Sequence, residues 1–194
     1  MASWILTVIL ASPLAYMVLL TATNGLGANP VERLLILAGQ GTLSLLIFLL
    51  ALPGTAKLSG WAWPKAWMRH RRAIGLSIFA YASLHMLLWL ADQLGEIDKL
   101  VDNLARPFTA SGLASWVILF LLAVTSNRFS IKKLGRRWKS LHRWVFFCIP
   151  LLFIHITLKD EGIWWSAALW LGPISLWVLL APKFKKNKPP SEAR

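Results

Sequence analysis

Residues 73–91 read AIGLSIFAYASLHMLLWLA and carry no charged side chain between Arg72 and Asp92. About 20 consecutive apolar residues make a helix long enough to cross the hydrocarbon core of a bilayer. The run also holds His85, and an ionisable side chain at such a depth is costly and usually serves a function. The stretch therefore predicts a transmembrane helix that carries a functional histidine.

Five other runs without Asp, Glu, Lys or Arg extend the prediction to six transmembrane helices. They are residues 1–31, 34–56, 107–127, 144–158 and 162–182. The run 144–158 is short, so we expect its helix to begin near Leu141, with Arg143 reaching the lipid headgroups. The run 1–31 lacks the basic segment that opens a signal peptide, which favours a retained helix. The predicted fold class is an all-α integral membrane bundle.

The composition supports this class. Hydrophobic residues make up 57% of the 194-residue chain and charged residues only 15%, whereas soluble domains are nearer half apolar and a quarter charged. The 12 Trp fit it as well, because indole rings favour the membrane–water interface. The single cysteine, Cys148, excludes an internal disulfide and any cysteine-rich zinc or iron–sulfur site.

The net charge of +13 follows the expected topology. Most basic residues lie in the loops 57–72 and 128–143 and in the tail 183–194, whereas the alternate loops hold seven of the eight acidic residues. Because cytoplasmic loops are enriched in Lys and Arg, both termini are predicted to face the cytoplasm of a bacterial inner membrane. The basic charge then marks topology and contact with anionic lipids, and it requires no nucleic-acid partner. Residues 1–182 form the predicted membrane domain, followed by a disordered basic tail.

Two of the four histidines are expected deep in the bundle at one level. His85 lies about 18 Å along its helix from the cytoplasmic end, and His155 lies about 20 Å beyond His142, at 1.5 Å rise per residue. Two helices that present imidazoles at one level can supply both axial ligands of a b-type haem. His85 and His155 are therefore candidate haem ligands. The alternative is a pair of hydrogen-bonded histidines in a packed core.

His142 and His70 are candidate ligands for a second site at the cytoplasmic level. His142 is offset from His155 by about 220° on a straight helix, although Pro150 between them can bend that helix. His70 shares a helix face with His85 but lies among basic residues at the membrane edge, where histidine is ordinary. The histidines thus allow one haem or two.

Arg71 and Arg72 are candidate contacts for the acidic groups of a cofactor. Guanidinium groups pair with carboxylates and phosphates, so these residues could bind haem propionates or a flavin phosphate. The alternative is that they only anchor the helix at the cytoplasmic surface. A zinc site usually adds cysteine or carboxylate ligands, and a proton-coupled transporter usually needs a membrane-embedded carboxylate. The six uncharged runs contain no carboxylate, which weakens both of these hypotheses.

Four segments, together with His155, form a recognisable set. They are residues 26–30, 71–85, 115–126 and 134–142. Over roughly residues 25–180 the chain resembles the MsrQ (YedZ) family, the haem-binding membrane subunits of periplasmic methionine sulfoxide reductase systems. That family belongs to the ferric reductase-like transmembrane domains, which fits the six-helix prediction.

The resemblance implies that His85, His142 and His155 bind haem b, and it allows FMN as a further cofactor. It implies electrons drawn from the quinone pool or a flavin donor. They would pass to a periplasmic molybdopterin-containing subunit that reduces methionine sulfoxide in proteins, so this chain would be the electron-transfer subunit rather than the catalytic one. Two other hypotheses stay open: a ferric or cupric reductase-type carrier with another partner, and a cofactor-free membrane scaffold or transporter.

One segment departs from the family pattern. The family carries a histidine and an arginine near a Thr-Gly pair in its second helix, whereas residues 37–42 here read LAGQGT. The resemblance therefore assigns no cofactor ligand to this helix.

Overall fold

The structure, a computed structural model, describes residues 3–94, 97–159 and 171–173, and every regular element within them is helical. Five helical runs in this part of the chain are long and apolar enough to cross a membrane: Trp4–Ala22, Pro30–Ser59, Arg71–Gln93, Pro107–Val124 and Arg136–Lys159. The all-α, multi-pass membrane fold is therefore confirmed. The sixth predicted span, residues 162–182, lies outside the described residues except at 171–173, as does the whole predicted tail.

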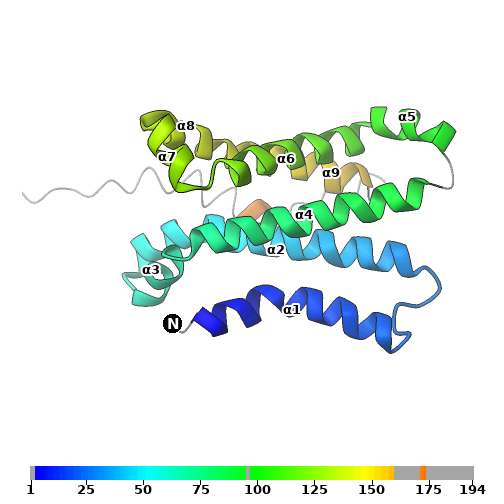
Figure 1. Cartoon of the computed structure of the whole chain (residues 1–194), viewed down its shortest axis with the longest axis horizontal. Helices are drawn as coiled ribbons and strands as arrows, with labels where there is room; N and C mark the ends of the chain where they lie inside the picture. Colours follow the sequence, from blue (N-terminus) through cyan, green and yellow to red (C-terminus); the bar gives the residue numbers. More distant parts are fainter. Residues whose placement is uncertain (1–2, 95–96, 160–170, 174–194) are drawn as a thin grey trace, which may run out of the picture.

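Long helices run the length of the bundle, and short helices lie at its ends (Figure 1). The elements in chain order are α1 (Ser3–Ala22), α2 (Pro30–Ser59), α3 (Ala62–Met68), α4 (Arg71–Gln93), α5 (Ile97–Ala105), α6 (Pro107–Val124), α7 (Arg128–Leu134), α8 (Arg136–His142), the 3-10 helix η1 (Arg143–Phe147) and α9 (Cys148–Lys159). The helices α3, α7 and α8 lie at the same end as the N-terminus, whereas α5 and the α1–α2 connection lie at the other end. This alternation matches the alternation of basic and acidic loops in the sequence.

Helix α2 shows how local sequence sets the ends of a span. Pro30 lies in its first turn, where a backbone N–H would have no partner. The side-chain oxygen of Asn29 accepts a hydrogen bond from the Glu32 N–H at 3.3 Å, which caps the helix. Gly60 ends it with a φ of 69°, a left-handed conformation that glycine adopts without strain. The helix extends past the uncharged run 34–56 at both ends because these caps, and not the first charges, set its bounds.

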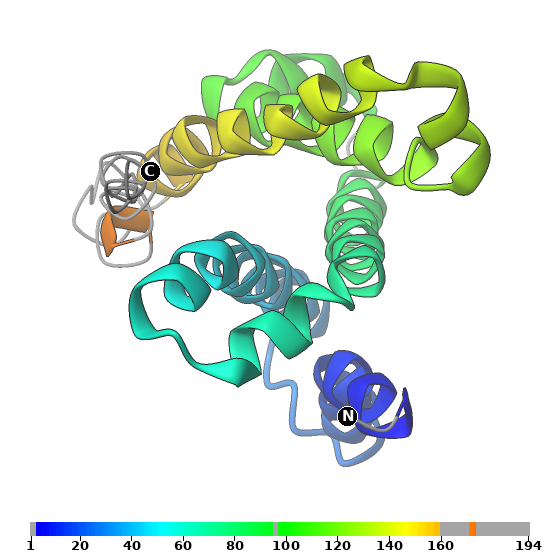
Figure 2. The same ribbon diagram turned by 90° about the vertical axis from the view of Figure 1, so that its left-hand side faces the viewer.

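Helix α4 lies between α2 and α6 (Figure 2). Ile74 and Ile78 are fully buried and pack in one cluster with side chains of α2 and with Leu119 of α6. Trp116 of α6 donates a hydrogen bond from Nε1 to Ser83 Oγ of α4 at 3.1 Å. Helix α6 packs in turn along α9. The side chains of α4 that face the bundle therefore have fixed neighbours on both sides.

Tyr81 joins α4 to α1. Its hydroxyl donates a hydrogen bond to the Leu10 carbonyl at 2.7 Å and accepts one from the Leu14 N–H at 3.2 Å. These two backbone groups are the pair that an uninterrupted helix would join to each other. The hydroxyl thus lies in the hydrogen-bond ladder of α1, next to Pro13, and side-chain insertion of this kind is a recognised cause of helix bending.

The fifth helical run begins earlier than the sequence predicts and is not uniform. It starts at Arg136, not near Leu141, and passes through the 3-10 turn of η1 before α9 begins. Pro150 has no N–H to donate to the carbonyl of Phe146, which disfavours a continuous α-helix across this point. As the third residue of α9, Pro150 lies in a first turn that tolerates it.

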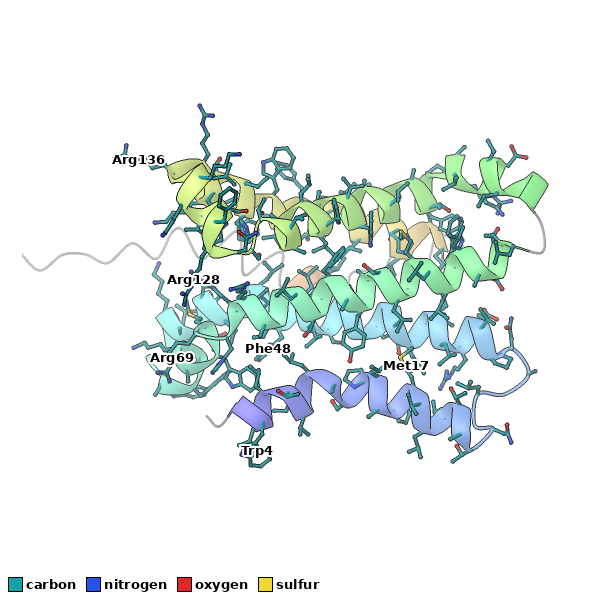
Figure 3. The ribbon with its side chains drawn as sticks, viewed as in Figure 1. Trp4, Met17, Phe48, Arg69, Arg128 and Arg136 are labelled. Carbon is teal, nitrogen blue, oxygen red and sulfur yellow. The ribbon has the colours of Figure 1, made fainter. Side chains whose placement is uncertain are left out.

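The surface of the bundle fits a membrane environment. Large apolar side chains on the long helices, such as Val8 and Leu19, are exposed, as expected where lipid and not water surrounds the protein. Figure 3 shows Arg69, Arg128 and Arg136 at one end of the bundle, the end that bears α3, α7 and α8. Basic side chains from segments far apart in the sequence therefore gather at a single end.

Candidate functional site

The structure brings His85 of α4 and His155 of α9 together. Their ring centroids lie 6.1 Å apart, and their ring planes are inclined at 81°. Both side chains are half-buried. The expectation that these histidines share one level of the bundle is therefore met.

Both rings line a cavity of about 450 Å³ between α2, α4, α6 and α9. Cofactor and ligand sites usually occupy about 300–1,000 Å³ and combine apolar walls with a few polar groups. The wall here is mainly apolar and includes Leu43, Met86 and Trp116. The cavity thus has the size and chemistry of a cofactor site with two imidazoles in its wall.

Backbone carbonyls fix the tautomer of both rings. His85 Nδ1 lies 2.9 Å from the carbonyl oxygen of Leu35, and His155 Nδ1 lies 2.7 Å from that of Phe108. A carbonyl can only accept, so in each ring Nδ1 carries the hydrogen and donates it. The neutral ring then has its lone pair on Nε2. In metal-binding histidines, the ring nitrogen that does not bind the metal commonly donates to a carbonyl, and this hydrogen bond orients the ring.

The distance between the ring centres is close to that expected for two imidazoles that bind one metal atom. Metal–imidazole bonds measure about 2.0–2.1 Å and the ring centre lies about 1.1 Å behind the nitrogen, so two rings on opposite sides of one metal have centres roughly 6.3 Å apart. The observed separation is 6.1 Å. Across the described part of the chain, no three His, Cys, Asp or Glu side chains come close enough to hold a metal ion. Two imidazoles without a third protein ligand suit a haem iron, whose other ligands belong to the macrocycle.

The same cavity holds two polar groups suited to an acidic ligand. The Thr109 side chain is only 8% exposed, and its Oγ1 has no hydrogen-bond partner among the residues that the structure describes. A buried hydroxyl without a partner is unfavourable unless a ligand supplies one. Lys159, one turn after His155 on α9, is the only charged side chain among the described lining residues. Together these groups could bind a carboxylate.

His142 lies apart from this cavity. Its ring stacks on Trp138 with centroids 4.0 Å apart, and its Nε2 lies 3.2 Å from Thr125 Oγ1. Trp138 Nε1 also donates to the Thr125 carbonyl at 2.9 Å. His142 is therefore held in a separate cluster where α6 ends and α8 ends, and it is not among the residues that line the cavity.

The other predicted contacts lie at the start of α4. His70 precedes the helix without a side-chain cap hydrogen bond, and Arg71 and Arg72 are exposed in its first turn. Arg71 is about 20 Å along the helix from His85, at 1.5 Å per residue. None of these three residues contributes to the lining of the cavity that holds His85 and His155. They lie instead toward the end of the bundle that carries His142.

Sequence reasoning missed four residues of the site: Gly39, Thr109, Gly112 and Lys159. All four line the cavity, and both glycines lie against histidine rings. Each glycine lies one helical turn after the residue whose carbonyl contacts a histidine. That relationship is visible only once the helix pairs are known.

The sequence of the chain matches a known protein family. Residues 38–153 match the family described as "Ferric reductase like transmembrane component". The match includes Gly39, His85 and Gly112 and ends two residues before His155. No solved structure matches the chain.

Curated relatives cover almost the whole chain. A Brucella anthropi protein named "Protein-methionine-sulfoxide reductase heme-binding subunit MsrQ" is 36% identical over 98% of this chain and 87% of that protein. The protein of the same name from Brucella ovis is 34% identical over 96% of this chain and 85% of that protein. The similarity therefore extends along both helix pairs that form the cavity.

Proposed function

The chain belongs to the ferric reductase-like transmembrane family, among its MsrQ heme-binding subunits, and on that premise we propose that it carries electrons through the membrane on haem b. The acceptor is a methionine sulfoxide reductase subunit, as the names of the relatives suggest. This chain is the electron-transfer subunit, and the partner carries the catalytic site.

The observation that carries the proposal is the pair of imidazoles in one cavity. His85 and His155 lie with ring centres 6.1 Å apart, and Nδ1 of each ring lies against a backbone carbonyl, so each neutral ring carries its lone pair on Nε2. A bound haem supplies a one-electron redox couple, whose potential depends on axial ligands, burial and neighbouring hydrogen bonds. A haem held by both His85 and His155 would supply electron transfer rather than a binding position for a substrate.

The remaining residues of the cavity would hold and shield the cofactor. Thr109 Oγ1 and the Lys159 ammonium group are suited to the carboxylates of the macrocycle. The apolar wall, with Trp116 held by its hydrogen bond to Ser83, excludes water from the space around the two rings. The protein thus supplies orientation, charge pairing and a dry environment.

We assign the topology from the charge distribution. Six spans with both termini in the cytoplasm of the bacterial inner membrane place the basic end, with α3, α7 and α8, on the cytoplasmic side. The cavity then lies toward the periplasmic side, because Thr109 is in the first turn of α6 and Lys159 is the last residue of α9. A periplasmic molybdopterin-containing subunit would receive electrons there.

Electrons would enter at the opposite end, from the quinone pool or a flavin donor. His142, stacked on Trp138, lies at that end and is the candidate ligand for a second haem. Arg71 and Arg72 would pair with the acidic groups of a second haem or of FMN at the same level. They lie too far along α4 to contact a haem held by His85.

Reconstitution in vesicles tests the proposed electron path. The purified chain is inserted into liposomes, reduced anaerobically with a quinol, and mixed with a purified periplasmic methionine sulfoxide reductase subunit and methionine sulfoxide. The haem bands should appear on addition of quinol and disappear when the reductase and its substrate are both present. Reoxidation by a ferric chelate but not by the reductase would replace this function with that of a ferric reductase. A protein without haem would overturn both.

A further inference from the structure

Two glycines lie directly against the rings of His85 and His155. A Cβ atom on Gly39 would stand 3.0 Å from His85 Nδ1 and 3.1 Å from its Cε1. A Cβ atom on Gly112 would stand 2.8 Å from His155 Nδ1 and 2.9 Å from its Cε1. Non-bonded carbon atoms in favourable contact lie about 3.5–4.0 Å apart. A methyl group at Gly39 would therefore press on the ring of His85, and one at Gly112 would stand so close to the ring of His155 that the ring would have to move.

Each glycine has the same position relative to the carbonyl that its histidine contacts. Leu35, whose oxygen contacts the ring of His85, precedes Gly39 by four residues on α2. Phe108, whose oxygen contacts the other ring, precedes Gly112 by four residues on α6. A helical side chain leans toward the N-terminus and covers the turn before its own Cα. A side chain at either glycine would thus cover the carbonyl that the ring must reach.

We propose that Gly39 and Gly112 are positioning residues, each of which leaves one helix carbonyl uncovered so that the facing histidine donates from Nδ1 and presents Nε2 to the cavity. The proposal rests on the proposed function in one respect, since Nε2 is the atom offered to iron. The same arrangement occurs in both helix pairs, α2 with α4 and α6 with α9. Helices α2 and α6 therefore each place a glycine one turn after the carbonyl that a histidine contacts.

Other glycines in the spans do not have this relationship. A Cβ on Gly41, two residues further along α2, would meet Pro13 and Tyr81 at 3.7 and 3.8 Å, which is ordinary contact. A Cβ on Gly75 of α4 would meet nothing within 4 Å. Gly41→Ala and Gly75→Ala are therefore matched controls for Gly39→Ala and Gly112→Ala.

The first test reads the tautomers directly in the haem-free, full-length protein labelled with ¹⁵N-histidine. In the wild type, His85 and His155 should give the ¹⁵N shifts of a ring protonated on Nδ1. Gly39→Ala should move only the His85 signal toward the Nε2-protonated form that a free histidine favours in water, and Gly112→Ala should move only that of His155. Unchanged signals in both variants, as in the two controls, would overturn the proposal.

A double-mutant cycle provides a second test that does not depend on haem. Gly39→Ala should lower the melting temperature of the haem-free protein by about 2–4 °C. In a His85→Ala background the same change should have no such effect, because the colliding ring is absent. An equal loss in both backgrounds would show that Gly39 acts on helix packing and not on the histidine. The cycle of Gly112 with His155 should behave in the same way, with a larger loss.

A third measurement links the glycines to iron ligation. After haem is added, Gly112→Ala should show a high-spin fraction in its electron paramagnetic resonance spectrum that the wild type and Gly41→Ala lack. A fully low-spin spectrum in Gly112→Ala would contradict a ligand-positioning role. If the wild type binds no haem, the proposed function fails, but the tautomer measurement still decides the role of the glycines.

Discussion

The rings of His85 and His155 lie with their centroids 6.1 Å apart and their planes at 81°. They come from helices that belong to different pairs, α4 packed on α2 and α9 packed on α6. Each ring is held by a carbonyl of its own pair, so the two rings are oriented independently and meet only across the cavity. The geometry of the site therefore depends on how the two helix pairs pack against each other.

The carboxylates of a bound haem should interact with Lys159. Lys159→Ala removes the charged side chain from the lining of the cavity, and haem should leave about 3- to 10-fold faster, the range expected for one charge-assisted contact. The measurement is the rate of haem transfer from the detergent-solubilised protein to excess apomyoglobin. Lys159→Arg should retain most of the wild-type rate. Lys133→Ala, at the other end of the bundle, is the charge control, and an identical rate in all variants would rule out this contact.

Thr109→Val should affect the empty and the loaded protein in opposite directions. The substitution removes a buried hydroxyl that has no partner in the described structure, so the haem-free protein should melt about 2–4 °C higher. Haem should dissociate a few-fold faster, because a ligand contact is lost. Thr42→Val is the matched control: Thr42 is also 8% exposed, but its hydroxyl donates to the Ala38 carbonyl. A gain in melting temperature in both variants would show that the unpaired hydroxyl has no special role.

Tyr81→Phe should loosen α1 without affecting the cofactor. The variant removes both hydrogen bonds of the hydroxyl to Leu10 and Leu14, at a cost of about 1–2 kcal/mol. For a chain of this size that corresponds to a melting temperature roughly 2–8 °C lower. Thermal unfolding followed by circular dichroism measures it. Tyr16→Phe, at an exposed tyrosine of α1, should leave the melting temperature unchanged, and haem content should be normal in both variants.

His142→Ala should leave the haem held by His85 and His155 in place. Its ring stacks on Trp138 at the other end of the bundle, outside the cavity. If the wild type carries two haems per chain, the variant should lose one and keep the other. His70→Ala should change neither. Haem per chain from the pyridine haemochrome assay decides the matter, and loss of all haem in His142→Ala would show that the two levels depend on each other.

The sequence is sufficient to predict the five long apolar helical runs that the structure describes and the common level of His85 and His155, and physical reasons explain why. Uncharged runs near 20 residues have little alternative to a membrane span, and a constant rise per residue converts position into depth. For that reason the amino-acid order alone matches His85 and His155 in level. Capping residues such as Asn29 and Gly60 act locally, and they place both ends of α2 beyond the uncharged run 34–56.

The rest of the site depends on which faces of the helices meet, and a single sequence does not specify this. Gly39 lies in the segment where the family pattern is absent, and only the packing of α2 on α4 shows that this segment faces His85. Thr109 and Lys159 are ordinary residues near helix ends until the cavity brings them together. The change from η1 to α9 is likewise a matter of three-dimensional packing, although Pro150 indicates that the helix changes course there.

The most direct test of the account is haem per chain, with the reduced-minus-oxidised spectrum, in the wild type, His85→Ala and His155→Ala. All three proteins are purified in detergent after expression with ample haem. Each single variant should lose the same haem, one per chain relative to the wild type, together with its low-spin bands. A full low-spin spectrum and unchanged haem content in both variants would contradict the assignment of His85 and His155 as the two axial ligands.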